Sequence, residues 1–251
     1  MKRRSTTLGL PLLALPLVIA ALAGAVPTAA SAATLPRAVV KAPETFPVHF
    51  TSTSGAGTLE TVKGRTVHCE ADTDEGTIAG EYELNKTIVK FTKCTAKGPF
   101  GTLTCTTAGA KSGEIITNDL KGKPVFTDKA ETEAGVALQP ESGTVFASFK
   151  CTGFLVEEVL TVGVKSGEPN GKDSLVCPIT PINTFATSFT LSCKQAKGVQ
   201  EPEGYWESGT LHTDYLETEG TGSEPFSFEQ SGLTTEGGDK ITTATEVKIE
   251  T

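Results

Sequence analysis

The sequence has few of the residues from which catalytic and metal centres are usually built. Only three histidines, one tryptophan and one methionine occur in 251 residues. The G-x-S-x-G, H-E-x-x-H, P-loop and G-x-G-x-x-G patterns are missing. His49, His68 and His212 also lack the spacing of a tetrahedral zinc site. These absences weigh against a nucleophilic hydrolase, and we expect no catalytic site, no cofactor and no metal centre.

Basic residues are scarce as well. The chain has 22 lysines and arginines against 30 aspartates and glutamates, a net charge of -8. Three of the basic residues stand at the extreme N-terminus, and removing them leaves 19 against 30, or about -11. An acidic surface repels phosphate backbones, so we expect no nucleic-acid partner and interpret the charge as a means of solubility.

The first 32 residues have the composition of a secretory signal peptide. Three basic residues precede the apolar run LGLPLLALPLVIAALAGAV, and Ala30-Ser31-Ala32 resembles a cleavage site. A retained anchor is the alternative, because about 20 apolar residues span a bilayer. Pro11, Pro16 and the cleavage site favour the signal peptide. We therefore expect a secreted, extracellular protein that begins near Ala33 and has no membrane segment after cleavage.

The cysteines indicate disulfide bonds rather than a metal or redox site. No C-x-x-C occurs, which argues against a thioredoxin-like pair. The cysteine count is even and export leads to an oxidising space, where disulfides persist. The candidates are Cys69, Cys94, Cys105, Cys151, Cys177 and Cys193.

The sequence indicates that the cysteines form disulfides more clearly than it indicates which cysteines pair. Five of the six follow an apolar residue by two positions, a spacing that places both side chains on one face of a strand; Cys94 is the exception. Six cysteines allow fifteen connectivities. Our prediction is Cys94–Cys105 across a turn at Gly98-Pro99, Cys177–Cys193 across the proline-rich connection, and Cys69–Cys151 by elimination, with a bulge or bend near Cys94.

Alternating polar and apolar residues run through the sequence after the leader. The stretch FATSFTLSC places Phe185, Phe189, Leu191 and Cys193 on one face, as a half-buried antiparallel strand requires. Helical spacing is hard to find, and 36 threonines follow the leader, a β-branched type that favours strands. The fold class predicted is all-β, an antiparallel sandwich or barrel stapled by disulfides.

Turn-rich segments suggest how the chain is organised. Residues 33–45 have linker composition and are predicted to be a flexible arm. Residues 46–251 form the all-β region, either as one domain or as two with a boundary near 165–174, in KSGEPNGKDS. Both alternatives remain open at this stage.

A series of spaced landmarks carries a family resemblance: VHCEADTDEGTIAG, KTIVKFTKCTAKG, LTCTTAGAKSGEIITNDLKGKPVF, GVALQPESGTVFASFKCTG and PITPINTFATSFTL. In these landmarks the chain resembles a group of secreted, cysteine-containing, β-rich proteins of unknown function predicted from actinobacterial genomes. The resemblance covers roughly residues 60–195. It implies export and brings no activity, cofactor or functional residue.

Two short stretches are candidate ligand sites. Asp72, Asp74 and Glu75 cluster beside a glycine and offer oxygen ligands to Ca²⁺. The stretch lacks the distal Glu and a further Asp of an EF-hand loop, so an ordinary solvated turn is favoured. In EPEGYWESG, Tyr205 and Trp206 lie between glutamates and would suit the face of a sugar ring. The alternative favoured for Trp206 is that it plugs one end of the core.

These observations predict a secreted, non-catalytic structural or binding protein of the cell surface or extracellular space, with a polysaccharide or protein surface as partner. The alternative is a carbohydrate-active module or a glycoside hydrolase, which needs two carboxyl groups roughly 5 to 9.5 Å apart. Candidate pairs are Glu81 with Glu83 on one strand face, Glu157 with Glu158, and the cluster at 203–207. Solvated strand glutamates explain the same residues.

Overall fold

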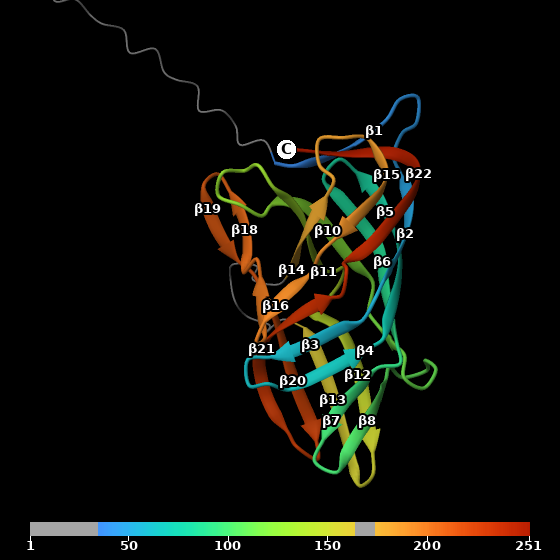
Figure 1. Ribbon diagram of the computed structural model, residues 1–251, viewed down its shortest axis with the longest axis vertical. Helices are drawn as coiled ribbons and strands as arrows, with labels where there is room; N and C mark the ends of the chain where they lie inside the picture. The colour runs from blue at the N-terminus through green and yellow to red at the C-terminus, as the bar shows by residue number, and fades with distance from the viewer. Residues whose placement is uncertain (1–34, 164–173) are drawn as a thin grey trace, which may run out of the picture. The chain divides into compact units, whose positions relative to one another are not determined.

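The computed structural model describes residues 35–163 and 174–251, and Ala33–Thr251 forms one compact unit (Figure 1). Strands and turns make up the described residues, which contain no helix, so the all-β prediction is confirmed. Nor does the described part of the chain hold a helix long and apolar enough to cross a bilayer. The predicted signal peptide, 1–32, and the predicted boundary segment up to residue 173 lie outside the described residues.

Twelve strands form one large antiparallel sheet. They are β1 (Arg37–Val40), β2 (Val48–Ser54), β5 (Ala71–Gly80), β6 (Glu83–Thr92), β9 (Ile115–Ile116), β10 (Leu120–Phe126), β11 (Ala134–Pro140), β14 (Leu175–Thr180), β15 (Ala186–Leu191), β18 (Gly204–Glu207), β19 (Thr210–Thr213) and β22 (Asp239–Glu250). Their order is β19-β18-β10-β11-β14-β15-β22-β2-β5-β6-β9, with β1 on β22. A further pairing of β10 with β6 curls the sheet round on itself.

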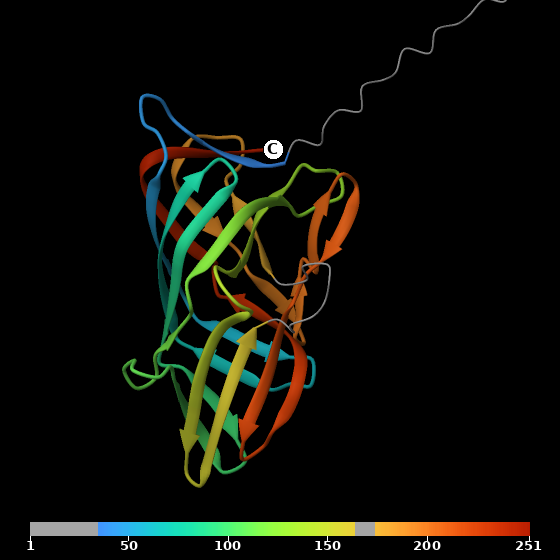
Figure 2. The ribbon, with the colours of Figure 1, turned by 180° about the vertical axis from the view of Figure 1, so that it is seen from behind.

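Eight other strands close into a barrel, drawn below the large sheet in Figure 1 and seen from behind in Figure 2. They are β3 (Gly57–Thr61), β4 (Thr66–Cys69), β7 (Thr95–Gly98), β8 (Gly101–Thr106), β12 (Val145–Gly153), β13 (Val156–Gly163), β20 (Leu216–Gly222) and β21 (Phe226–Thr235). Around the barrel the order is β12-β13-β20-β21-β3-β4-β7-β8. The short pair β16 (Lys194–Ala196) and β17 (Val199–Glu201) forms a separate ribbon.

The chain passes repeatedly between the large sheet and the barrel. Strands from both sides of residues 164–173 belong to both: β11 pairs with β14 in the sheet, and β13 pairs with β20 in the barrel. One hydrophobic cluster also includes side chains from both, such as Val136 of β11 and Phe149 of β12. The sheet and the barrel therefore share one core.

All six cysteines are buried in three disulfides, as predicted, but two of the three predicted pairs are wrong. The bonds are Cys69–Cys94, Cys105–Cys151 and Cys177–Cys193. The Cys105 N–H donates to the Cys94 carbonyl at 2.9 Å, so the two residues predicted to bond are indeed neighbours. Each bonds to its other neighbour instead: Cys151 lies directly opposite Cys105 in the β8–β12 pair.

The parity of Cys94 explains why the prediction failed there. Cys94 lies between β6 and β7 rather than within a strand, and Lys93 before it has a positive φ of 53°. Because of this turn, the inward and outward alternation of side chains in β6 does not continue through Cys94. The Cys94 side chain instead points into the core, where it is fully buried. The β4–β7 register pairs His68 with Thr95, which brings Cys69 beside Cys94.

The predicted flexible arm is wrong for part of its length. Residues Arg37–Val40 form β1, which pairs with the C-terminal part of β22. Strand β2 reaches only as far as Thr243 on β22, so β1 pairs with backbone groups beyond it, and buried backbone groups need such partners. Ala38 is 1% exposed, and Arg37 Nη2 lies 2.7 Å from Glu250 Oε2. The linker-like composition of residues 33–45 therefore gave no indication of this strand of four residues.

Candidate metal centre

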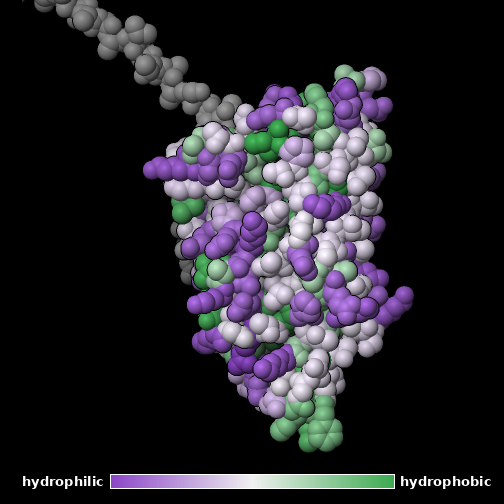
Figure 3. Space-filling model, viewed as in Figure 1, coloured by the Kyte–Doolittle hydropathy of each residue, from purple (hydrophilic) through white to green (hydrophobic). Residues whose placement is uncertain are grey.

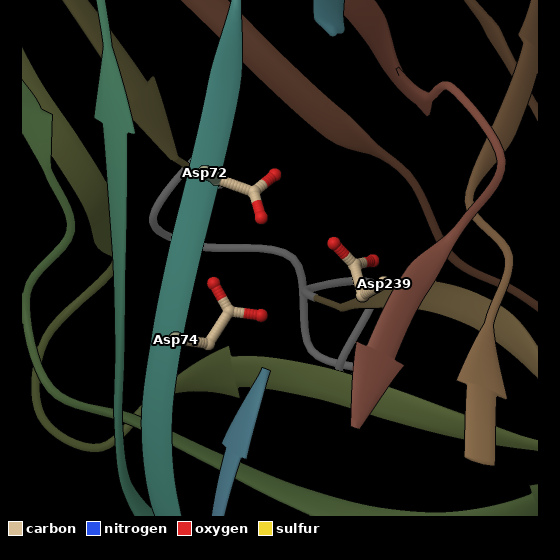
Figure 4. A group of neighbouring side chains, drawn as sticks. All are labelled: Asp72, Asp74 and Asp239. Atoms are coloured by element: carbon tan, nitrogen blue, oxygen red, sulfur yellow. The ribbon is translucent and has the colours of Figure 1, made fainter. Parts of the chain in front are cut away.

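Three aspartates meet inside the large sheet. Asp72 and Asp74 lie on β5, and Asp239 is the first residue of β22. One carboxylate oxygen of each lies within 4.8 Å of the other two. Figure 4 shows the Asp72 and Asp74 side chains projecting from one side of β5 toward Asp239. The cluster therefore joins two strands that are distant in the sequence.

Strand β2 sets this geometry, because it lies between β5 and β22. Its register places Ser54 opposite Asp72 and Ser52 opposite Asp74. On the other side, Thr53 pairs with Lys240, which brings Asp239 next to Ser54. Residues two apart on a strand share a face, so Asp72 and Asp74 point the same way, toward the core.

Two of the carboxylates are buried, that of Asp74 is half-buried, and all three are incompletely hydrogen-bonded. Asp72 is 2% exposed and Asp239 is 5% exposed. Ser54 Oγ donates to Asp72 Oδ2 at 2.5 Å, and Thr235 Oγ1 donates to Asp239 Oδ2 at 3.4 Å. Asp72 Oδ1 and Asp74 Oδ1 are buried atoms that receive no hydrogen bond from the described part of the chain. A buried acceptor without a donor is destabilising by about 1 to 3 kcal/mol, and by more when it is charged.

Ser52 supplies a further oxygen on the same face. It is 3% exposed and lies opposite Asp74 in the β2–β5 register, and a hydrogen bond from its hydroxyl opposes the rise in the pKa of Asp74. Buried hydroxyls are nearly always satisfied in folded proteins. Ser52 therefore adds a hydroxyl oxygen to the face that holds the three carboxylates.

Burial disfavours the charged form of each aspartate. Desolvation, with the charges of Asp72 and Asp239, raises the pKa of Asp74 to about 8. Desolvation and the charge of Asp72 raise the pKa of Asp239 to about 7. Burial also raises the pKa of Asp72, and its hydrogen bond from Ser54 opposes this. Among the described residues, no basic side chain contributes to any of these shifts. Protons or a bound cation must therefore balance the charge.

The donor set is the one that Ca²⁺ prefers. Calcium takes 6 to 8 oxygen ligands at about 2.3 to 2.6 Å, so two ligands of one ion lie at most about 5 Å apart. The spacing of the three carboxylates, within 4.8 Å, satisfies this limit. Mg²⁺ requires a near-ideal octahedron and usually keeps several waters, and zinc prefers nitrogen and sulfur ligands. The hydroxyls of Ser52 and Ser54, opposite Asp74 and Asp72 in the register, are further oxygens on the same face.

The sequence-based interpretation of this region was partly wrong. Asp72, Asp74 and Glu75 were expected in a solvated turn, yet all three lie within β5. Glu75 is exposed on the opposite face of the strand, and Asp239 completes the cluster instead. Sequence reasoning missed Asp239 because its partners are far along the chain. Its one local signal is an aspartate that follows Gly237-Gly238 and opens an alternating strand.

Tyr205 and Trp206 do not form a joint platform. They are consecutive on β18, so their side chains point to opposite faces. The Tyr205 ring stacks on His212 with 5.0 Å between ring centroids, and Lys123 Nζ lies 4.4 Å from the Tyr205 ring centroid. Trp206 is half-buried near Lys129 and is absent from the core clusters, so it does not plug the core either.

The paired glutamates occupy dissimilar places. Glu81 lies in the turn before β6, which begins at Glu83, so the predicted shared strand face is wrong. Glu157 and Glu158 lie on opposite faces of β13. Glu157 is exposed and pairs with Lys150 at 2.8 Å, whereas Glu158 is buried on the inner face of the barrel. In neither pair do the two carboxylates face each other across a cleft, as a glycoside hydrolase requires.

Comparisons with known proteins returned nothing for this chain: no family model, no curated protein and no solved structure matches it.

Proposed function

We propose that the chain is a secreted, non-catalytic structural or binding protein of the cell surface or extracellular space, and that a Ca²⁺ ion bound by Asp72, Asp74 and Asp239 stabilises its fold. The observation that carries the proposal is that two buried carboxylates and one half-buried carboxylate lie within 4.8 Å of one another, with no basic side chain of the described residues to balance them.

The disulfides support the extracellular setting. All six cysteines are paired and buried, and such bonds persist in oxidising compartments. The leader of the sequence points the same way. Extracellular modules bind Ca²⁺ with dissociation constants of about 10⁻⁴ to 10⁻³ M, so the fluid around a secreted protein can load a modest site.

A structural role for the ion follows from the burial of its ligands. Asp72 and Asp239 are 2% and 5% exposed, as the ligands of a structural ion are. The ion instead bridges β5 to β22 across β2 and removes the repulsion among the three aspartates. Cation binding and folding are thereby coupled, because the unfolded chain has no such site.

Thermal unfolding at pH 7.5, with Ca²⁺ or with EDTA, tests the proposal. At 100 times the dissociation constant a ligand adds about 2.7 kcal/mol to the free energy of unfolding, which raises Tm by roughly 5 to 10 °C in a protein of this size. The gain should vanish in Asp239→Asn and persist in Glu75→Gln, a matched change on the exposed face of β5. An unchanged Tm in the wild type would reject the calcium site.

A second candidate function is carbohydrate binding, favoured by an open groove on the outer face of β2, β5 and β6. Its volume is about 650 Å³, and its lining includes His49, Lys86, Asp119 and Glu141. This volume is in the usual range for small-ligand sites, and the charged side chains in its lining suit sugar hydroxyls. Co-sedimentation with insoluble polysaccharides, lost in Asp119→Asn with Glu141→Gln, would support it; equal sedimentation of the variant would not.

A further inference from the structure

The end of the barrel away from the large sheet carries an exposed apolar tip. Two hairpin turns form it: Pro99-Phe100 between β7 and β8, and Phe154-Leu155 between β12 and β13. Phe100 is 68% exposed, Phe154 76% and Leu155 79%, more than any other large hydrophobic residue of the described chain. Figure 3 shows hydrophobic side chains gathered at this end, below a surface that is mostly polar.

The two turns form one continuous patch. Strands β8 and β12 are neighbours, with Thr104 opposite Thr152. The Leu103 side chain packs under both hairpins, because it is the nearest neighbour of Gly98 in one and of Gly153 in the other. Leu103 itself is 2% exposed. The tip is therefore an apolar surface supported by the core.

The second turn contains a residue type that is unfavourable in its backbone conformation. Two-residue hairpin loops favour Asn and Gly, which adopt positive φ easily. Leu155 occupies such a position, with φ of 56°, and its side chain is exposed. A bulky residue with positive φ is rare, and such strain is often found at functional sites. The fold gains no packing from this leucine, so a role outside the fold explains it.

We propose that the apolar tip inserts into a lipid surface, at the boundary between headgroups and acyl chains. The three large side chains offer at most roughly 500 Å² together. A stable protein partner or a second copy of the chain would need about 800 Å² on each side. Lipid needs no complementary shape, and it accepts convex, protruding turns to a depth of about 5 to 10 Å.

The charges around the tip agree with a lipid partner. The exposed Lys150 and Glu157 side chains pair with each other at 2.8 Å, and Lys97 lies on β7 beside the first turn. In the neighbouring β20–β21 turn Glu224 lies 4.0 Å from Arg65, so acids and bases balance here too, although the whole chain has a net charge of -8. Anionic headgroups would therefore not repel the tip as they repel the rest of the surface.

Flotation with phosphatidylcholine vesicles, with and without phosphatidylglycerol, tests the proposal. The double variant Phe154→Ser with Leu155→Asn should bind at least tenfold more weakly than the wild type. Asn tolerates positive φ, so the variant should melt at the same temperature or higher, which separates lost binding from misfolding. Leu211→Ser, which changes an exposed leucine of β19, is the matched control and should bind as the wild type does.

Three results would overturn the proposal: no binding of the wild type to either vesicle, binding unchanged in the double variant, or self-association without lipid that the double variant abolishes. The last would assign the tip to a second copy of the chain. Measurement in both Ca²⁺ and EDTA separates this surface from the aspartate cluster. Tip binding in EDTA with no Ca²⁺ effect on Tm would leave the lipid surface standing and reject the calcium site.

Discussion

Replacing Asp74 with Asn should make the metal-free protein more stable at neutral pH. The pKa of Asp74 rises from 3.8 to about 8 in the folded state, chiefly through desolvation. The folded protein therefore holds a proton on Asp74 that the unfolded chain has lost between these pH values, so the contribution of Asp74 to stability is greatest below about pH 4 and falls as pH rises toward 8. At about 1.4 kcal/mol per pH unit, the fall from pH 4 to pH 7 is about 4 kcal/mol.

Asp74→Asn removes this titration, because the amide stays neutral at every pH. In EDTA at pH 7 we expect the free energy of unfolding to increase by up to about 4 kcal/mol, and Tm by roughly 10 °C. The pH dependence between 4 and 7 should flatten at the same time, while Glu75→Gln, on the exposed face of β5, should change neither. Urea unfolding at several pH values in EDTA provides the measurement.

Two observations would refute this reasoning. One is wild-type stability that does not fall between pH 4 and pH 7 without metal. The other is an Asp74→Asn variant less stable than the wild type at pH 7 in EDTA. Either would mean that the cluster is solvated or paired in solution, and that neither protons nor a cation are needed to balance it.

Three further changes test other parts of the account. Removing the Cys105–Cys151 bond, which closes 46 residues, with a double alanine variant should lower the free energy of unfolding by about 4 kcal/mol, and non-reducing peptide maps should show a Cys69–Cys94 peptide. Ala38→Glu places a charge at a buried position of β1 and should lower stability by about 3 kcal/mol in urea unfolding; no loss would return β1 to a loose arm. The fluorescence of half-buried Trp206 should be quenched by acrylamide to a degree between a buried and a free indole.

Local patterns in the sequence predicted the local structure well. The alternation in FATSFTLSC gave the inward faces of Phe189 and Leu191, both buried on β15. It was wrong for Phe185, which is 37% exposed because the β15–β22 register shifts between Ala186 and Ser188. Cys177 and Cys193 were matched correctly because few residues separate them and the bond joins neighbouring strands β14 and β15. Strand faces follow from a period of two, which needs no knowledge of strand partners.

What the sequence could not provide was the pairing of distant strands. The barrel and the large sheet exchange strands along the whole chain, and no local signal states that β5 and β22 flank β2. For this reason Asp72 and Asp74 were recognised without Asp239, and Glu75 took its place. The predicted pairing of Cys94 with Cys105 was wrong for the same reason, because which cysteine lies next to each of them depends on the order of the strands around the barrel.

Calorimetric titration of the oxidised protein with Ca²⁺ near pH 7, in two buffers of different ionisation enthalpy, tests the central claim most directly. The raised pKa values of Asp74 and Asp239 mean that the metal-free cluster retains protons at this pH. The account predicts one bound ion per chain with release of protons, visible as a heat that depends on the buffer, and loss of this signal in Asp74→Asn. An absence of heat in both buffers, or binding without proton release that Asp74→Asn leaves intact, would contradict it.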